Sequence, residues 1–262
     1  MENSEITVST DLEELSRAAA RKFVELACAN GNAGYSFAVA LSGGSTPKRL
    51  YELLADENEP YRAAVDWRKI NFFWGDERCV APDADESNYR MANEHLLEPL
   101  GISEAKIHRF KSELDAQTAA ADYDRFLRVL FNKPAGSFPH FDVVLLGMGA
   151  DGHTASLFPH TEVLRETEKL VAAVFVEKHD AFRLTLTPPV LNRAANVIFQ
   201  VAGADKAAAL REVLEGENQP DKFPAQLVNP PNGKIFWFID EAAAASLTIT
   251  RHYENFSGRL RR

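Results

Sequence analysis

Short apolar runs alternate along this chain with longer segments whose apolar residues recur every three or four positions. The runs occupy residues 35–40, 70–74, 141–146, 171–176, 196–201 and 235–239. Continuous apolar runs of this length are typical of strands that are covered on both faces. Because helical segments separate them, they predict an α/β fold. We expect a mostly parallel β-sheet with helices on both faces, in a single domain of residues 1–262.

Capping residues mark where several of the predicted helices begin. Asp11, Ser87 and Asp115 each stand just before a segment with helical spacing, and their side-chain oxygens suit the N-cap position. Asp240 follows the last apolar run and is expected to cap the alanine-rich segment behind it. Two shorter strands are predicted at residues 6–8 and 183–187, and residues 75–80 are predicted as a loop.

A first glycine-rich loop, LSGGSTP, follows the run at residues 35–40. Pro47 suits the first turn of a helix, so the loop leads directly into a helix N-terminus. Exposed N–H groups there favour an anion, which Gly43 and Gly44 allow the backbone to approach, while Ser45 and Thr46 add hydroxyl donors. The spacing is neither GxGxxG nor that of a P-loop, so a single phosphate group fits better than a dinucleotide or ATP. A tight turn without a ligand is the alternative.

A second loop of this kind, GMGADGH, follows the run at residues 141–146 and carries Asp151 and His153. Ligands of open α/β sheets bind beyond the carboxyl ends of the strands, and a histidine there can act as a base near neutral pH. A solvated loop histidine is the alternative interpretation. Two glycine-rich loops at two strand ends favour a functional site.

Further charged residues stand at other predicted strand ends. Arg78 follows the run at residues 70–74, with Asp76 and Glu77 as supporting candidates. Lys206 lies in the first helical turn after residues 196–201, and Arg183 begins a strand. Such cations can hold a phosphate or polarise a carbonyl group. The alternative for residues 76–78 is an exposed loop whose charges pair with one another. The alternative for Lys206 is a solvated side chain.

Composition excludes several classes of function. The net charge of −9 disfavours binding to nucleic acid or to an anionic membrane surface. Two cysteines, no apolar run of membrane-spanning length and no signal peptide pattern predict a cytoplasmic protein. The sequence has no HxxxH or HExxH pattern, so we expect no metal site. It has no GxSxG pattern either, so we expect no nucleophilic serine. We expect a small-molecule substrate and a monomer or small homo-oligomer.

Several segments together resemble those of 6-phosphogluconolactonases, in the superfamily that also contains glucosamine-6-phosphate deaminases. The segments are, in order, LSGGSTPKRLYELL, FFWGDERCV with SNYRMANEHLL, LLGMGADGHTASLFP, RLTLTPP and VAGADKAAAL. The resemblance extends from Ile6 to about Ile239. It implies a Rossmann-like fold and hydrolysis of 6-phospho-D-glucono-1,5-lactone to 6-phospho-D-gluconate, with no cofactor and no metal. The matching motifs imply that His153 is the base and that Arg78 and Arg183 contact the substrate. They also imply that five residues contact the phosphate: Gly43, Gly44, Ser45, Thr46 and Lys206.

The residues fit this chemistry. A lactone is an activated ester, so a water molecule deprotonated by His153 can attack C1 directly. We expect Asp151 to orient the imidazole or the water, and Arg78 or backbone N–H groups to stabilise the oxyanion.

Two other functions remain open. Sugar-phosphate deaminases of the superfamily carry a DGHIAFNEP-like stretch with a glutamate before the proline. Here Phe158 stands before Pro159 and cannot relay a proton. A sugar-phosphate sensor of a transcription regulator would carry a separate DNA-binding segment, for which the acidic chain offers no candidate.

Overall fold

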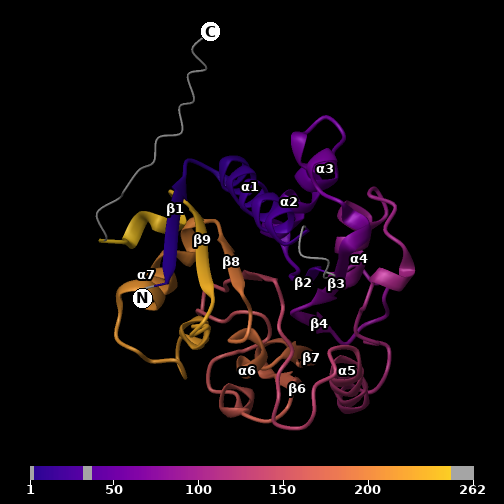
Figure 1. Ribbon diagram of the computed structural model, residues 1–262. Helices are drawn as coiled ribbons and strands as arrows, with labels where there is room; N and C mark the ends of the chain where they lie inside the picture. Colours follow the sequence, from indigo (N-terminus) through magenta and orange to yellow (C-terminus); the bar gives the residue numbers. More distant parts are fainter. Residues whose placement is uncertain (1–2, 32–36, 249–262) are drawn as a thin grey trace.

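The central element of the fold is a six-stranded sheet in which all neighbouring strands are parallel. The computed structural model describes residues 3–31 and 37–248. Across the sheet the strands follow the order β1 (Ser4–Ser9), β9 (Lys234–Asp240), β8 (Asn196–Val201), β5 (Val143–Gly147), β2 (Phe37–Leu41) and β3 (Ile70–Trp74) (Figure 1). This confirms the predicted parallel sheet. Residues 35 and 36, at the start of the predicted strand, lie outside the described residues.

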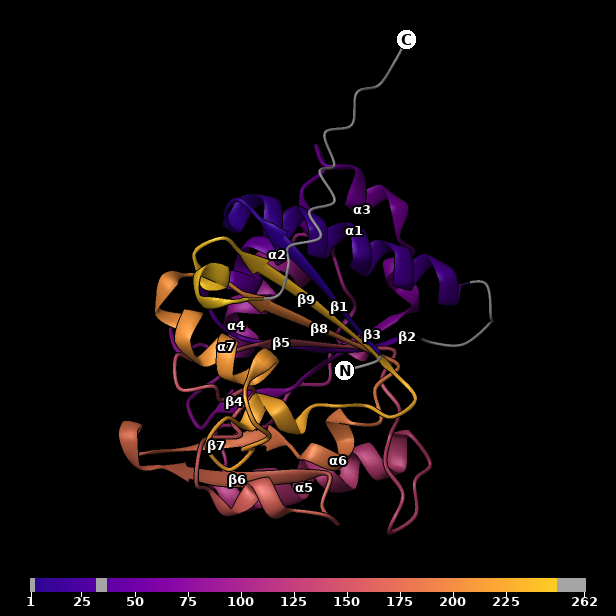
Figure 2. The ribbon, with the colours of Figure 1, turned by 90° about the vertical axis from the view of Figure 1, so that its left-hand side faces the viewer.

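Helices cover both faces of the sheet, as predicted. One face carries α1 (Leu12–Gly31), α2 (Ser45–Ala55) and α3 (Pro60–Ala64), and α7 (Ala207–Glu215) lies on the other (Figure 2). The remaining helices are α4 (Asn88–Ala92), which continues into a π-helical turn at Asn93–Leu97, α5 (Ala116–Leu130) and α6 (Pro188–Leu191). None of the helices within the described ranges has the length and apolar character needed to cross a membrane.

A second, antiparallel sheet departs from the sequence prediction. It has the order β4 (Asp76–Arg78), β7 (Ala181–Leu186) and β6 (Val171–Val176), and α5 packs against it. Residues 76–78 were expected in a loop, because three polar residues carry no strand pattern. Strands were predicted at residues 171–176 and 183–187 without a second sheet. They pair antiparallel, because the four-residue turn between them is too short for a parallel crossover.

The predicted caps are present at the helix starts. The backbone N–H of Glu14 donates to Asp11, that of Arg90 to Ser87, and those of Gln117 and Thr118 to Asp115. Asp240 accepts from the backbone N–H of Ala243 at 2.7 Å, at the start of a short 3₁₀ turn.

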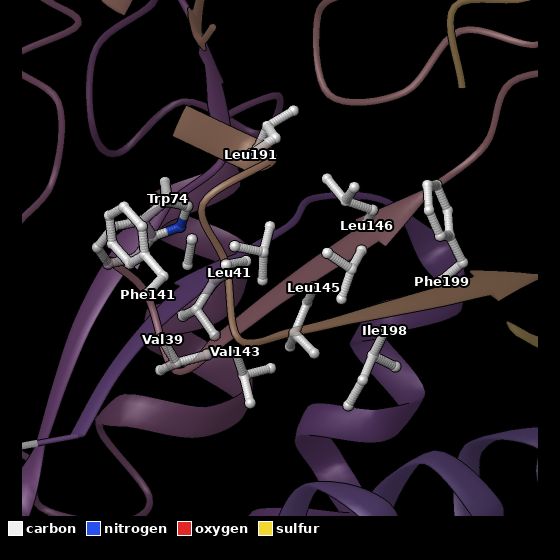
Figure 3. Close-up of a cluster of buried hydrophobic side chains, with 14 of the residues drawn as sticks. Val39, Leu41, Trp74, Phe141, Val143, Leu145, Leu146, Leu191, Ile198 and Phe199 are labelled. Atoms are coloured by element: carbon white, nitrogen blue, oxygen red, sulfur yellow. The ribbon is translucent and has the colours of Figure 1, made fainter. Parts of the chain in front are cut away.

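The middle of the parallel sheet is almost completely buried. Side chains of β2, β5 and β8 meet there with neighbours from β3, α6 and the segment before β5 (Figure 3). Each is at most 1% exposed: Val39, Leu41, Trp74, Phe141, Val143, Leu145, Leu146, Leu191, Ile198 and Phe199. Full burial of such a side chain stabilises the fold by roughly 1.5–3 kcal/mol. The loops that leave these strands therefore start from rigid positions.

The strand order reverses between β2 and β5. After β2 the chain adds β3 on one side, and β5, β8 and β9 then extend the sheet on the other. At such a switch point the loops leaving the two central strands diverge and open a crevice at their carboxyl ends. The two glycine-rich loops predicted to be functional are the ones that leave β2 and β5.

Candidate active site

A cavity of about 360 Å³ lies over the carboxyl ends of these central strands. The volume is in the range of small-molecule sites. Nine of the candidate residues line it: Gly43, Gly44, Ser45, Thr46, Asp76, Arg78, His153, Arg183 and Lys206. Asp151 and Glu77 are not among the lining residues. The structure thus brings together loops from β2, β5 and β8 with two arginines of the antiparallel sheet.

The loop after β2 presents the N-terminus of α2 to the cavity. Gly44 occupies the N-cap position with φ 105°, a backbone conformation that favours glycine, and no side chain caps the helix. The first N–H groups of α2 therefore remain available to an anion. Tyr51 fixes the loop from behind: its hydroxyl accepts from the Ser42 N–H at 3.0 Å and donates to the Ser42 carbonyl at 2.8 Å.

Gly43 is required by a close approach to α4. A Cβ atom at this position would lie 1.7 Å from Oδ1 of Asn88, so no side chain fits. Asn88 is buried and also lines the cavity, and its Nδ2 donates to the backbone carbonyl of Asp76. Within the described residues its Oδ1 has no hydrogen-bond partner.

His153 and Asp151 form a hydrogen-bonded pair at the end of β5. Nδ1 of His153 lies 2.5 Å from Oδ1 of Asp151, and this hydrogen bond holds the pKa of the Asp151 carboxyl well below its usual range. The ionised carboxylate makes Nδ1 the protonated nitrogen, so Nε2 is the nitrogen that can accept a proton. Asp151 itself does not line the cavity.

Two neighbours fix the imidazole ring of His153. Phe158 stacks on it with a centroid distance of 4.1 Å and an interplanar angle of 24°. A Cβ at Gly149 would lie 2.1 Å from Nδ1, so the glycine leaves the room that the ring occupies. Phe158, the residue that distinguishes this stretch from the deaminase pattern, therefore packs directly against the candidate base.

Arg78 and Arg183 project from the antiparallel sheet. They are directly opposed in the β4–β7 ladder, so their side chains share one face of the sheet. Burial lowers the pKa of Arg183, and the positive charge of Arg78 lowers it further. Arg78 donates to the backbone carbonyl of Glu86. Two neighbouring guanidinium groups at one cavity wall favour a negatively charged ligand.

Asp76 and Glu77 have different surroundings, although they are adjacent in sequence. Asp76 faces the cavity and accepts from the hydroxyl of Ser156 at 2.7 Å. Glu77 is 1% exposed and points away from it. Its carboxylate accepts from the backbone N–H groups of Arg78, Asn88 and Tyr89 at 2.7–2.8 Å. Burial raises the pKa of Glu77, and these N–H groups oppose the shift. Glu77 thus ties β4 to the start of α4 and has a structural role.

Lys206 approaches the cavity from the far side of β5. It ends a 3₁₀ turn at Ala204–Lys206 that leads into α7, and its Nζ lies 2.8 Å from Oδ2 of Asp205. The carboxylate of Asp240 accepts from the N–H of Gly203 at 3.0–3.1 Å and so holds this turn in position. The lysine reaches the same cavity as the α2 N-terminus.

Sequence reasoning missed several polar residues of the cavity wall, among them Asn88, Ser156, His179 and Gln200. Asn88 stands inside a segment that the resemblance covers, but nothing in its own spacing marks it. No sequence pattern singles out His179, which lines the cavity beside Phe158. Among the described residues there is no group of three or more potential metal ligands.

The chain is similar to known proteins over most of its length. Residues 10–237 match the family described as glucosamine-6-phosphate isomerases/6-phosphogluconolactonase. A 6-phosphogluconolactonase from Synechocystis sp. is 45% identical over 80% of this chain and 84% of its own length. One from Homo sapiens is 42% identical over 93% and 94%. The solved 6-phosphogluconolactonase from Trypanosoma brucei superimposes with a TM-score of 0.83 at 33% identity, over 93% of this chain and 98% of its own.

Proposed function

This chain belongs to the family of glucosamine-6-phosphate isomerases and 6-phosphogluconolactonases, and we propose that it hydrolyses 6-phospho-D-glucono-1,5-lactone with His153 as the base. The enzyme is a hydrolase, and its product is 6-phospho-D-gluconate. This reaction is the second step of the oxidative pentose phosphate pathway. The observation that carries the proposal is the single cavity that joins the α2 N-terminus and Lys206 to His153.

The phosphate group binds at the end of the cavity formed by the loop after β2. Unpaired N–H groups and the positive end of the helix dipole attract a dianion, and Ser45 and Thr46 add hydroxyl donors. Lys206 supplies the balancing positive charge. Held there, the phosphate directs the lactone ring toward the loop after β5.

Hydrolysis begins when Nε2 of His153 takes a proton from a water molecule that attacks C1 of the lactone. Asp151 keeps the ring in the required tautomer and stabilises the imidazolium that forms. Arg78 and Arg183 stabilise the oxyanion of the tetrahedral intermediate. When the bond between C1 and the ring oxygen breaks, the imidazolium returns its proton to that oxygen. The new carboxylic acid then ionises.

The deaminase alternative receives no support from the site. The position before Pro159 carries Phe158, whose ring is packed against His153 and has no proton to transfer. The two cysteines are unpaired, in keeping with the proposed cytoplasmic location.

A coupled assay with freshly generated lactone tests the proposal. The rate above spontaneous hydrolysis is measured for the parent and for His153→Ala, which should lose roughly 10²–10⁴-fold in kcat. His160→Ala is the matched control, because His160 also pairs with an aspartate, Asp221, but does not line the cavity. Near-parental turnover by His153→Ala would exclude it as the base.

A further inference from the structure

His179 lies at the cavity wall, although the mechanism above does not use it. It ends the short turn Glu177–His179 between β6 and β7, and the left-handed residue Asp180 (φ 47°) closes that turn. The ring of His179 meets Phe158 edge to face, with a centroid distance of 6.0 Å. Since Phe158 also stacks on His153, both histidines contact the same phenyl ring.

Positive charges lie close to this histidine. Arg183, Lys178 and Arg78 act on it electrostatically. The carboxylates nearby are those of Glu177 and Asp180 in its own turn and of Asp151, whose Oδ2 lies 3.8 Å from Nζ of Lys178. Desolvation lowers the pKa of His179, and those cations lower it further. The free enzyme therefore carries a neutral imidazole here at pH 7.

The reaction changes the charge at this end of the cavity. The substrate presents a neutral carbonyl group to His153, whereas the product presents a carboxylate. An anion within about 4–6 Å favours the protonated form of an imidazole. His179 faces the same space as His153 and is exposed enough to exchange protons with solvent.

We propose that His179 is a product-binding residue, which takes up a proton from solvent as it pairs with the newly formed carboxylate. This inference rests on the proposed function, because it requires the ester carbonyl to lie beside His153. Product affinity then increases as the pH falls, since the protonated imidazole attracts the carboxylate and the neutral one does not. Substrate affinity does not share this dependence, because the lactone has no carboxylate.

Direct binding measurements isolate this effect from catalysis. Titration calorimetry gives Kd for 6-phospho-D-gluconate and for sorbitol 6-phosphate, which carries the same phosphate on a chain that ends in an alcohol. The ratio of the two Kd values cancels the titration of the phosphate. In the parent the preference for the carboxylate should rise severalfold between pH 8 and pH 6, below the limit of about threefold to tenfold that a pKa increase of about half a unit to one unit sets at low pH.

Three variants decide the assignment. In His179→Gln the ratio should become nearly independent of pH, while His160→Gln should match the parent. A pH dependence that survives His179→Gln and disappears in His153→Gln would overturn the inference and assign the proton to His153. A flat ratio in the parent would also overturn it. Because binding is measured directly, these outcomes stay separate from the turnover test of His153→Ala.

Discussion

The hydrogen bond between Asp151 and His153 makes a sharp prediction about Asp151→Asn. The substitution keeps the shape of the side chain but replaces a carboxylate with a neutral amide at 2.5 Å from Nδ1. If the amide turns its NH₂ group to His153, Nδ1 becomes the acceptor and Nε2 carries the proton, so the ring cannot act as a base. Even with the correct tautomer, the imidazolium loses its counter-ion.

The expected loss of kcat follows from the role of the Asp151–His153 pair in proton transfer. General acid–base catalysis contributes roughly 10²–10⁴-fold, and Asp151→Asn should remove most of it from kcat. KM should change less than about threefold, since substrate binding does not involve Asp151, which does not line the cavity. Steady-state kinetics of lactone hydrolysis, corrected for the spontaneous reaction, measures both constants.

Asp221→Asn is the matched control for this experiment. Asp221 also pairs with a histidine nitrogen, Nδ1 of His160, at 2.8 Å, but this pair is exposed and neither residue lines the cavity. Its variant should keep parental kcat and KM. The reasoning is refuted if Asp151→Asn keeps more than about a tenth of the parental kcat, or if its defect appears in KM alone.

Two further substitutions test the phosphate end. Lys206→Ala should raise KM roughly 10- to 100-fold, because a hydrogen bond to a charged group contributes about 1.5–3 kcal/mol. The control Lys222→Ala should leave KM unchanged, because Lys222 does not line the cavity. An unaltered KM would remove Lys206 from the phosphate site. Gly43→Ala places a methyl group against Asn88 and should destabilise the fold by about 1–3 kcal/mol, which denaturant unfolding measures. If Gly43→Ala keeps the parental free energy of unfolding and the parental KM, the loop accommodates the methyl group and the prediction is wrong.

The parts of the fold that local sequence patterns determine were predicted well. The central strands are covered on both faces, so β2, β5 and β8 appear as continuous apolar runs, and the caps at Asp11, Ser87 and Asp115 act through their own neighbouring N–H groups. The two glycine-rich loops could be recognised for the same reason, since each directly follows such a run.

Features that depend on distant partners could not be predicted. β4 has three polar residues and exists only because β7 pairs with it. The burial of Glu77 depends on N–H groups of α4, and the position of His179 depends on how the β6–β7 hairpin folds over the cavity. No local spacing encodes these contacts.

The charged groups that line the cavity come from both sheets. Lys206 and the α2 N-terminus belong to the scaffold of the parallel sheet, whereas Arg78 and Arg183 extend from the small antiparallel one. A phosphorylated sugar acid that contacts the residues of both sheets links the two sheets through its own bonds. Because the two sheets cannot separate while it is bound, a saturating ligand raises the free energy of unfolding of the whole molecule.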